Sequence, residues 1–264
     1  MSSRDKYAFG IQAFDLSIRV ECESAEMRGM LNRFLLPPLE RCEVPAGAAQ
    51  IEIEALEESG GFAIQINAQK ISLATNIRDA ALAAVKALDD AVVEHLIGLR
   101  AVHAGAAKLK GRALLIPAST HAGKSSLVAE LLRRGAELFS DEYALVDEDG
   151  RVHSYPRPML LRNGSPRQTL VLPEDLNANF ADEPAIVGWI LAVDYDPRGA
   201  WDVEEISQGE AVMHLLRNTP HEMGQSPEMI HFFSRLAESA RCYSGTRGDV
   251  AEAADRILQL ISRN

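Results

Sequence analysis

The residues of this chain best suited to chemistry lie in one short stretch. Residues 118–125 read Ala-Ser-Thr-His-Ala-Gly-Lys-Ser, and they depart from the phosphate-binding pattern G-x-x-x-x-G-K-[ST] only at the first position. In such a loop, backbone N–H groups and the positive end of the following helix form a concave site for a polyphosphate. Lys124 would place a positive charge between the outer phosphates, and the hydroxyl of Ser125 would hold Mg²⁺. The expected nucleotide-binding residues are Ala118, Ser119, Thr120, His121, Ala122, Gly123, Lys124, Ser125 and Ser126.

Two positions of this loop are unusual. Ala118 replaces the first glycine, which is tolerable if the backbone there is not left-handed, because only then does a Cβ cost energy. His121 puts a bulky ring at the mouth of the loop. We expect this ring to point to solvent, with a contact to phosphate or to an acceptor as the alternative.

The flanking residues predict the strand and the helix that such a loop needs. Ala113 to Ile116 is a short apolar run typical of a buried strand. From Lys124 to Arg134, leucines and a valine recur at helical spacing, and Gly135 follows. The alternative is a Gly-Lys-Ser that merely opens a helix after a surface loop, and the preceding strand argues against it.

An acidic pair and a histidine lie near the loop in the predicted order of elements. Asp141 and Glu142 follow a brief strand at 137–139, and a hairpin with strands at 143–146 and 152–155 comes next. His103 lies in a predicted strand, 102–109, which a tight turn joins to the strand at 112–117.

This order resembles the catalytic core of the HPr kinase/phosphorylase family, whose members phosphorylate a serine on a small partner protein. The family's histidine-glycine strand is matched by His103-Ala104-Gly105, its loop end by Gly123-Lys124-Ser125 and its acidic pair by Asp141-Glu142. The match covers about His103 to Asp147, and its order and spacing are more specific than any one motif.

The resemblance implies a P-loop kinase core, a mixed sheet with flanking helices, that uses ATP and Mg²⁺ and forms a homo-oligomer. Within it Asp141 would take the proton of the acceptor hydroxyl, and Glu142 would join Ser125 at the metal. His103 would tune the acidic site or contact phosphate. These roles agree with the general needs of phosphoryl transfer, which are an aligned nucleophile, neutralised oxygens and a carboxylate for the proton.

The sequence departs from the family beyond the acidic pair. The Arg-Gly signature of the bifunctional enzymes has no equivalent at 154–159, which reads Ser-Tyr-Pro-Arg-Pro-Met. We therefore expect a kinase-like relative whose serine-bearing acceptor differs from the family's small partner protein, and the resemblance leaves phosphorylase activity open. Its acceptor would be a serine-type hydroxyl of a small protein, a peptide or a serine-like molecule.

The fold class expected for the whole chain is α/β, with this kinase core at 99–264 preceded by a small α+β unit at 1–98. The first unit shows a half-buried strand from Phe14 to Glu21, a helix that Ser24 can cap, and a long helix at about 79–97. Three short strands are expected between these helices, at 51–53, 62–66 and 71–73. In the second unit, 186–193 reads as another buried strand, and the chain from Glu210 onward reads as mainly helical, ending in a helix at 250–261.

The bulk composition limits the classes of partner. The chain has 264 residues, 47% hydrophobic residues and a formal net charge of −11. The negative charge argues against nucleic acid or an anionic membrane as the main partner. Apolar runs are too short to span a bilayer. The three scattered cysteines favour reduced thiols in a cytoplasmic protein.

Several residues have alternative readings. Asp194 ends an apolar run and would suit a second magnesium-binding carboxylate, although a strand ending at a turn explains it equally well. Three arginines fall in a polar loop after a strand, where they would clamp a phosphate or an acidic acceptor or simply lie in solvent. Arg217 is a further candidate for the charge on the transferred phosphoryl group. His214, His221 and His231 lack a metal-binding spacing. The three loop arginines are Arg157, Arg162 and Arg167.

Two other functions remain open at this point. One is a nucleotide-binding regulator with little turnover, in which Ala118 and His121 mark a weakened loop. The other is a P-loop NTPase that transfers phosphate to water.

Overall fold

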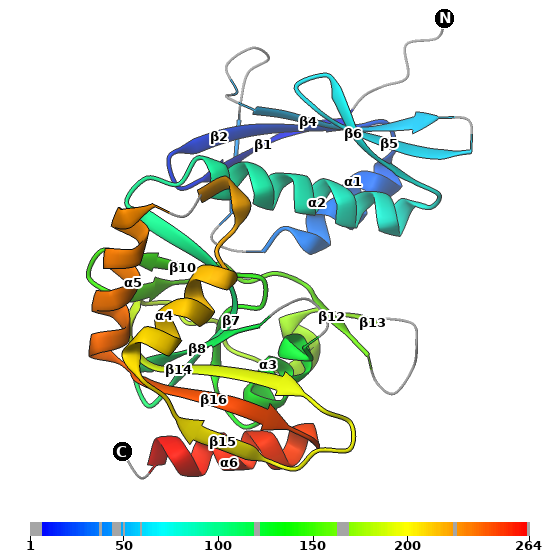
Figure 1. The fold of residues 1–264 in the computed structure, drawn as a ribbon. Coiled ribbons are helices and arrows are strands. Elements are labelled where there is room, and N and C mark those ends of the chain that lie inside the picture. Colours follow the sequence, from blue (N-terminus) through cyan, green and yellow to red (C-terminus); the bar gives the residue numbers. More distant parts are fainter. Residues whose placement is uncertain are drawn as a thin grey trace, which may run out of the picture. The chain divides into compact units, whose positions relative to one another are not determined.

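The computed structural model describes residues 7–36, 39–43, 49, 51–58, 60–118, 122–162, 169–223 and 226–262. It is a mixed α/β structure, and the chain divides into two compact units, residues 1–97 and 98–264 (Figure 1).

The first unit is a six-stranded sheet with two helices along one face (Figure 1). Alternate residues of β2 are buried against these helices, namely Leu16, Ile18, Val20 and Cys22. The sheet order is β3-β1-β2-β4-β5-β6, with β1 at Tyr7–Ala13, β2 at Leu16–Cys22, β3 at Glu40–Cys42, β4 at Ile51–Glu58, β5 at Gly61–Ile66 and β6 at Gln69–Ala74. The helices are α1 (Ala25–Phe34) and α2 (Ile77–Glu94).

Two expectations for this unit need correction. The first predicted strand began at Phe14, but Phe14 has a φ of 55° in the turn between β1 and β2. The strand β1 was not predicted at all. Ser24 does cap α1 as expected, because its side chain accepts a hydrogen bond from the N–H of Met27 at 3.2 Å.

The second unit is built on an eight-stranded mixed sheet within the described residues. Its main path is β11-β10-β7-β8-β14-β16-β15, and β9 pairs with β7. The strands β8, β14 and β16 are parallel, so their carboxyl ends meet at one edge of the sheet. The bounds are β7 (Leu99–Leu109), β8 (Arg112–Pro117), β9 (Glu137–Ser140), β10 (Tyr143–Asp147), β11 (Arg151–His153), β14 (Ala185–Tyr195), β15 (Asp202–Glu205) and β16 (Arg241–Arg247).

Helices cover both faces of this sheet and produce two cores. On one face, α4 (Gln208–Arg217) and α5 (Pro227–Ser239) pack on residues such as Leu115 and Ile190. On the other, α3 (Lys124–Arg133) and α6 (Val250–Ser262) pack on residues such as Leu114 and Leu191. The result is a three-layer α/β/α arrangement (Figure 1).

The C-terminal stretch is mainly helical as expected, with α4, α5 and α6, but residues Arg241–Arg247 form the strand β16, which was not predicted. The carboxyl half of this strand carries serine, glycine and threonine, which hide the apolar periodicity of a buried strand. The edge strand β15 and the separate pair β12 (Met159–Leu161) and β13 (Thr169–Val171) were also not predicted.

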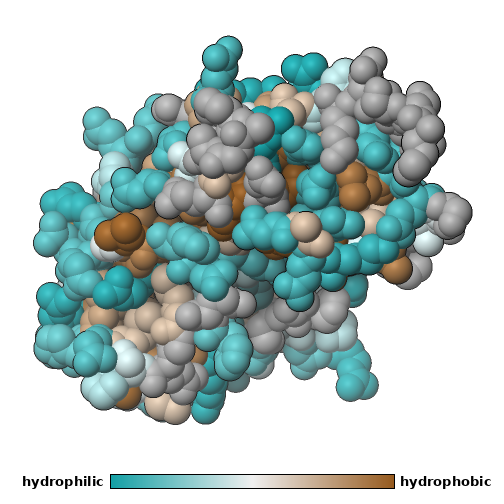
Figure 2. Space-filling model, turned by 90° about the horizontal axis from the view of Figure 1, so that it is seen from above, coloured by the Kyte–Doolittle hydropathy of each residue, from teal (hydrophilic) through white to brown (hydrophobic). Residues whose placement is uncertain are grey.

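The face of the molecule in Figure 2 is mostly hydrophilic, with hydrophobic residues gathered in patches. Across the described ranges, no helix combines the length and the apolar character needed to cross a membrane.

Candidate active site

The predicted phosphate loop leaves the carboxyl end of β8 and leads into α3. Ser119, Thr120 and His121 lie outside the described residues. Ala118 is buried and is not among the residues with positive φ, so its methyl group carries no backbone strain. Gly123 precedes the helix with a left-handed φ of 75°. A Cβ on Gly123 would also lie 2.3 Å from Nη2 of Arg247, so a larger residue here would strain the backbone and displace the guanidinium of Arg247.

Lys124 begins α3 with a side chain that is only 7% exposed. Its Nζ lies 3.0 Å from Nε2 of His103 on β7. Burial lowers the pKa of Lys124, while the charges of Glu142 and Asp141 act in the opposite direction. Gly105 on β7 makes room for this arrangement, because a Cβ there would lie 3.1 Å from Cγ of Lys124.

His103 connects the lysine to the acidic pair. Its Nε2 also lies 3.2 Å from Oε1 of Glu142, and Tyr143, its partner on β10, places a ring 6.0 Å away. Nε2 can accept a hydrogen bond from the ammonium of Lys124 only when it carries no proton. It can donate a hydrogen bond to the carboxylate of Glu142 only when it carries one. The proton on Nε2 therefore decides which of the two neighbours His103 binds.

Asp141 is the buried member of the acidic pair, at 4% exposure. The Ser125 hydroxyl lies close enough to lower the pKa of this carboxyl, and Oδ1 of Asp141 has no hydrogen-bond partner among the described residues. Burial raises the pKa of Asp141 to about 7, against the lowering effects of Lys124 and Ser125. The site thus holds a carboxyl group that changes protonation near neutral pH, with one oxygen free to accept a proton.

A turn fixed by Ser140 positions this carboxylate at the end of β9. The hydroxyl oxygen of Ser140 accepts the N–H groups of Glu142 and Tyr143, at 3.3 and 3.2 Å. The chain therefore reverses between β9 and β10 with Asp141 at the reversal. The buried Asp141 meets Ser125, while Glu142 is exposed beside His103.

Arg247, at the carboxyl end of β16, is a further residue of this site that the sequence did not suggest. It is 2% exposed, and its Nη2 donates to the carbonyl oxygen of Gly123 at 2.8 Å. The guanidinium lies 5.1 Å from the ring centroid of Tyr195, and burial lowers its pKa. Its Nε has no hydrogen-bond partner within the described part of the chain. No motif marks this arginine, and only the parallel pairing of β14 with β16 brings it to the loop.

The other predicted candidates are more dispersed. Asp194 is exposed at the end of β14. Arg157 is buried with its guanidinium 3.6 Å from the ring centroid of Tyr155, so the expected polar loop position was wrong for this residue. Arg162 and Arg217 are exposed, and Arg167 lies outside the described residues.

The residues present fit a magnesium ion that comes with a nucleotide. No group of three or more His, Cys, Asp or Glu side chains that could hold a metal occurs in the described ranges, the three C-terminal histidines included. Mg²⁺ is usually held by one or two carboxylates together with substrate phosphates, and it does not need a complete protein cage. Glu142, whose exposed carboxylate lies beside His103, is suited to that role together with the Ser125 hydroxyl at the start of α3.

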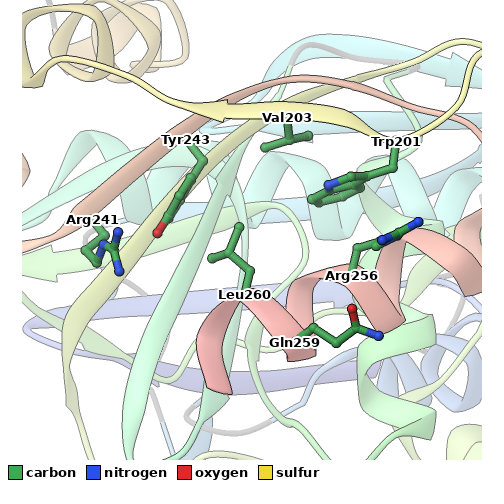
Figure 3. Close-up of a pocket in the computed structure, with 7 residues that line it drawn as sticks. All are labelled: Trp201, Val203, Arg241, Tyr243, Arg256, Gln259 and Leu260. Carbon is green, nitrogen blue, oxygen red and sulfur yellow. The ribbon is translucent and has the colours of Figure 1, made fainter. Parts of the chain in front are cut away.

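A cavity of about 320 Å³ lies on the α6 face of β15 and β16 (Figure 3). Val203 and Tyr243 line it from the strands, Trp201 lines it from the position before β15, and Arg256 and Leu260 line it from α6. None of its lining residues belongs to the loop or to the acidic pair.

No family model matches the sequence, and no curated protein does. Several solved structures match the fold. One of them is the Hpr(Ser) kinase/phosphatase from Coxiella burnetii, with a TM-score of 0.32 and 12% identity over 62% of this chain and 99% of that chain. A likeness this slight says nothing about activity.

Proposed function

We propose that residues 98–264 form an ATP- and Mg²⁺-dependent kinase that transfers the γ-phosphoryl group to a serine-type hydroxyl. The observation that carries this proposal is the buried Asp141, whose carboxylate lies close to the hydroxyl of Ser125 and in the field of Lys124 at the start of α3. A cation, a hydroxyl and a proton acceptor therefore meet where a helix begins, and anions bind favourably there.

Each residue has a separate task in this proposal. Lys124 balances the negative charge of the outer phosphates, and the N–H groups at the start of α3 bind their oxygens. Ser125 and Glu142 would hold Mg²⁺, which when bound would neutralise charge on the phosphate oxygens. His103 would hold Lys124 in place before the nucleotide arrives, because the two side chains are in direct contact.

Asp141 would take the proton of the acceptor hydroxyl. A general base works best when its pKa is near the pH of the reaction, and burial brings the pKa of this carboxyl to about 7. Its Oδ1 makes no hydrogen bond to the described residues, so the proton has an oxygen to go to.

The test is ADP release from Mg-ATP in the presence of a pool of serine-containing amino acids, peptides and small proteins. The wild type is compared with Lys124→Ala, Asp141→Asn and the control Asp255→Asn, which changes an exposed carboxylate on α6. We expect acceptor-dependent ADP release in the wild type and the control only, with ATP binding retained in Asp141→Asn.

Two results would contradict the proposal. Phosphate release that needs no acceptor would indicate an NTPase. ATP binding without turnover, unchanged by Asp141→Asn, would indicate a nucleotide-binding regulator.

A further inference from the structure

A second cavity lies on the face of the sheet opposite α3, between α4 and the strands β15 and β16. Its volume is about 400 Å³, within the range of small-molecule sites. We refer to it as the α4 cavity. Its apolar wall includes Ile206 and Met213, and its polar groups are Glu204, Glu210, His214, Arg217 and Ser244.

The α4 cavity presents unneutralised charges of both signs. Arg217 and Glu204 are exposed on its wall, and neither side chain makes an ion pair or hydrogen bond with any residue in the described ranges. Glu210 differs, because its Oε2 accepts from the N–H and the hydroxyl of Ser207 at the start of α4. Arg217 is thus available to an anionic group, and Glu204 to a cationic one.

A neutral polar pair lies on the same lining. Nε2 of His214 is 3.3 Å from the hydroxyl oxygen of Ser244. Burial, and then the charge of Arg217, lower the pKa of His214, although Asp194 and Glu210 oppose this. A neutral imidazole beside a hydroxyl can both donate and accept hydrogen bonds. This pair can therefore bind an uncharged polar group of a ligand, such as a hydroxyl.

Two contacts connect the α4 cavity to the candidate active site. The main-chain carbonyl of Asn218, the residue after Arg217, accepts the N–H of His103 at 2.7 Å. On β16, Gly245 lines the cavity, and Arg247, two residues further along the strand, donates to Gly123. The cavity therefore adjoins the loop edge of the sheet, on the side opposite α3.

We propose that the α4 cavity binds the phosphoryl acceptor, and that this acceptor is a small hydroxylated molecule with both a carboxylate and an ammonium group, such as a hydroxyamino acid. Arg217 binds the carboxylate, and Glu204 binds the ammonium group. The P–O bond between the γ-phosphorus and ADP breaks as a new P–O bond forms to the acceptor oxygen. The hydroxyl proton passes to Asp141. This inference rests on the proposed kinase function.

The experiment measures ADP release from Mg-ATP with L-serine, L-threonine and L-homoserine as probes, together with a blocked serine tripeptide. Phosphorus NMR identifies any phosphate ester. The cavity variants are Arg217→Gln and Glu204→Gln. Their matched controls are Glu205→Gln, which changes the neighbouring carboxylate paired with Arg241, and Arg235→Gln, which changes an exposed arginine of α5. ATP binding is measured separately by thermal unfolding.

We expect at least one free amino acid to be phosphorylated. Each cavity variant should raise the KM for that acceptor about tenfold or more, because a lost charged hydrogen bond has roughly that effect. The KM for ATP should stay at the wild-type value in the cavity variants. Both control variants should keep the wild-type KM for the acceptor and for ATP.

Three results would overturn the inference. The first is that ATP binds but no free amino acid is phosphorylated, whether or not the blocked tripeptide is. The acceptor is then of another class, and the kinase proposal still stands. If the cavity variants leave the acceptor KM unchanged, the acceptor binds elsewhere. If ATP does not bind at all, the kinase proposal fails and this inference fails with it.

Discussion

Arg247 donates a hydrogen bond to the carbonyl oxygen of Gly123 at 2.8 Å, across 124 residues of the chain. The arginine occupies the space that a Cβ at Gly123 would need, so each residue constrains the other. The glycine provides the left-handed backbone before α3, and the arginine holds its carbonyl. The orientation of the first N–H groups of α3 therefore depends on a residue from the other end of the second unit.

Replacing Arg247 should weaken nucleotide binding more than it weakens the fold. Arg247→Met removes the contact with Gly123 while the methionine fills the buried space. Because a buried cation is costly to retain, its loss should offset the lost hydrogen bond in the stability of the fold. We expect about a tenfold loss in affinity for Mg-ATP with only a small change in unfolding temperature, both measured by thermal unfolding across an ATP titration. Arg241→Met, at the other end of β16, is the control and should bind ATP normally. Equal affinities of Arg247→Met and the wild type would refute the positioning role.

Gly105→Ala should destabilise the second unit. The added methyl group would lie 2.5 Å from Cγ2 of Val128 and 3.1 Å from Cγ of Lys124. Overpacking of this kind costs about 1–3 kcal/mol, which urea unfolding can detect. Val128→Ala in the same chain should recover part of the loss. Gly209→Ala, where no atom lies within 4 Å, is the control and should be neutral or stabilising. A Gly105→Ala protein as stable as the control would contradict the close approach of β7 to α3.

The raised pKa of Asp141 gives a pH dependence with a defined sign. The pKa rises from 3.8 to about 7 on folding, so the folded state binds the proton more tightly than the unfolded state. The stabilisation is complete below pH 3.8 and is lost as the pH rises through about 7. Because one pKa unit corresponds to about 1.4 kcal/mol, Asp141→Asn should be more stable than the wild type by a few kcal/mol at pH 8. The difference should shrink towards pH 5.

Urea unfolding of the ligand-free protein at several pH values measures this effect. The control is Asp194→Asn, which changes an exposed carboxylate and should leave the pH profile unaltered. A profile that Asp141→Asn does not change would mean that Asp141 ionises normally, and the general-base role would lose its support.

The part of the site that could be predicted from the sequence is the part formed by neighbouring residues. The strand at 112–117, the helix from Lys124 and the turn carrying Asp141 follow from local apolar spacing and from turn residues. The approach of His103 to the loop follows from the short antiparallel connection between β7 and β8. The approach of Asp141 does not, because β9 pairs with β7 and is reached from β8 only through α3.

Arg247 and the α4 cavity could not be predicted in this way. Both depend on β16, whose polar carboxyl half masks its strand character, and on its parallel pairing with β14. Parallel partners are distant in sequence, so local periodicity carries no information about the pairing. The burial of Arg157 against Tyr155 was missed for a similar reason, because composition alone marks an arginine in a proline-rich segment as solvated.

The most direct test of the central claim is thermal unfolding of the wild type and of Lys124→Ala, each with and without Mg-ATP. A ligand at about a hundred times its dissociation constant adds roughly 2.7 kcal/mol to the stability of the protein it binds. The account predicts a clear rise in unfolding temperature for the wild type that is absent from Lys124→Ala. No rise in the wild type at saturating Mg-ATP, or an equal rise in both proteins, would contradict it.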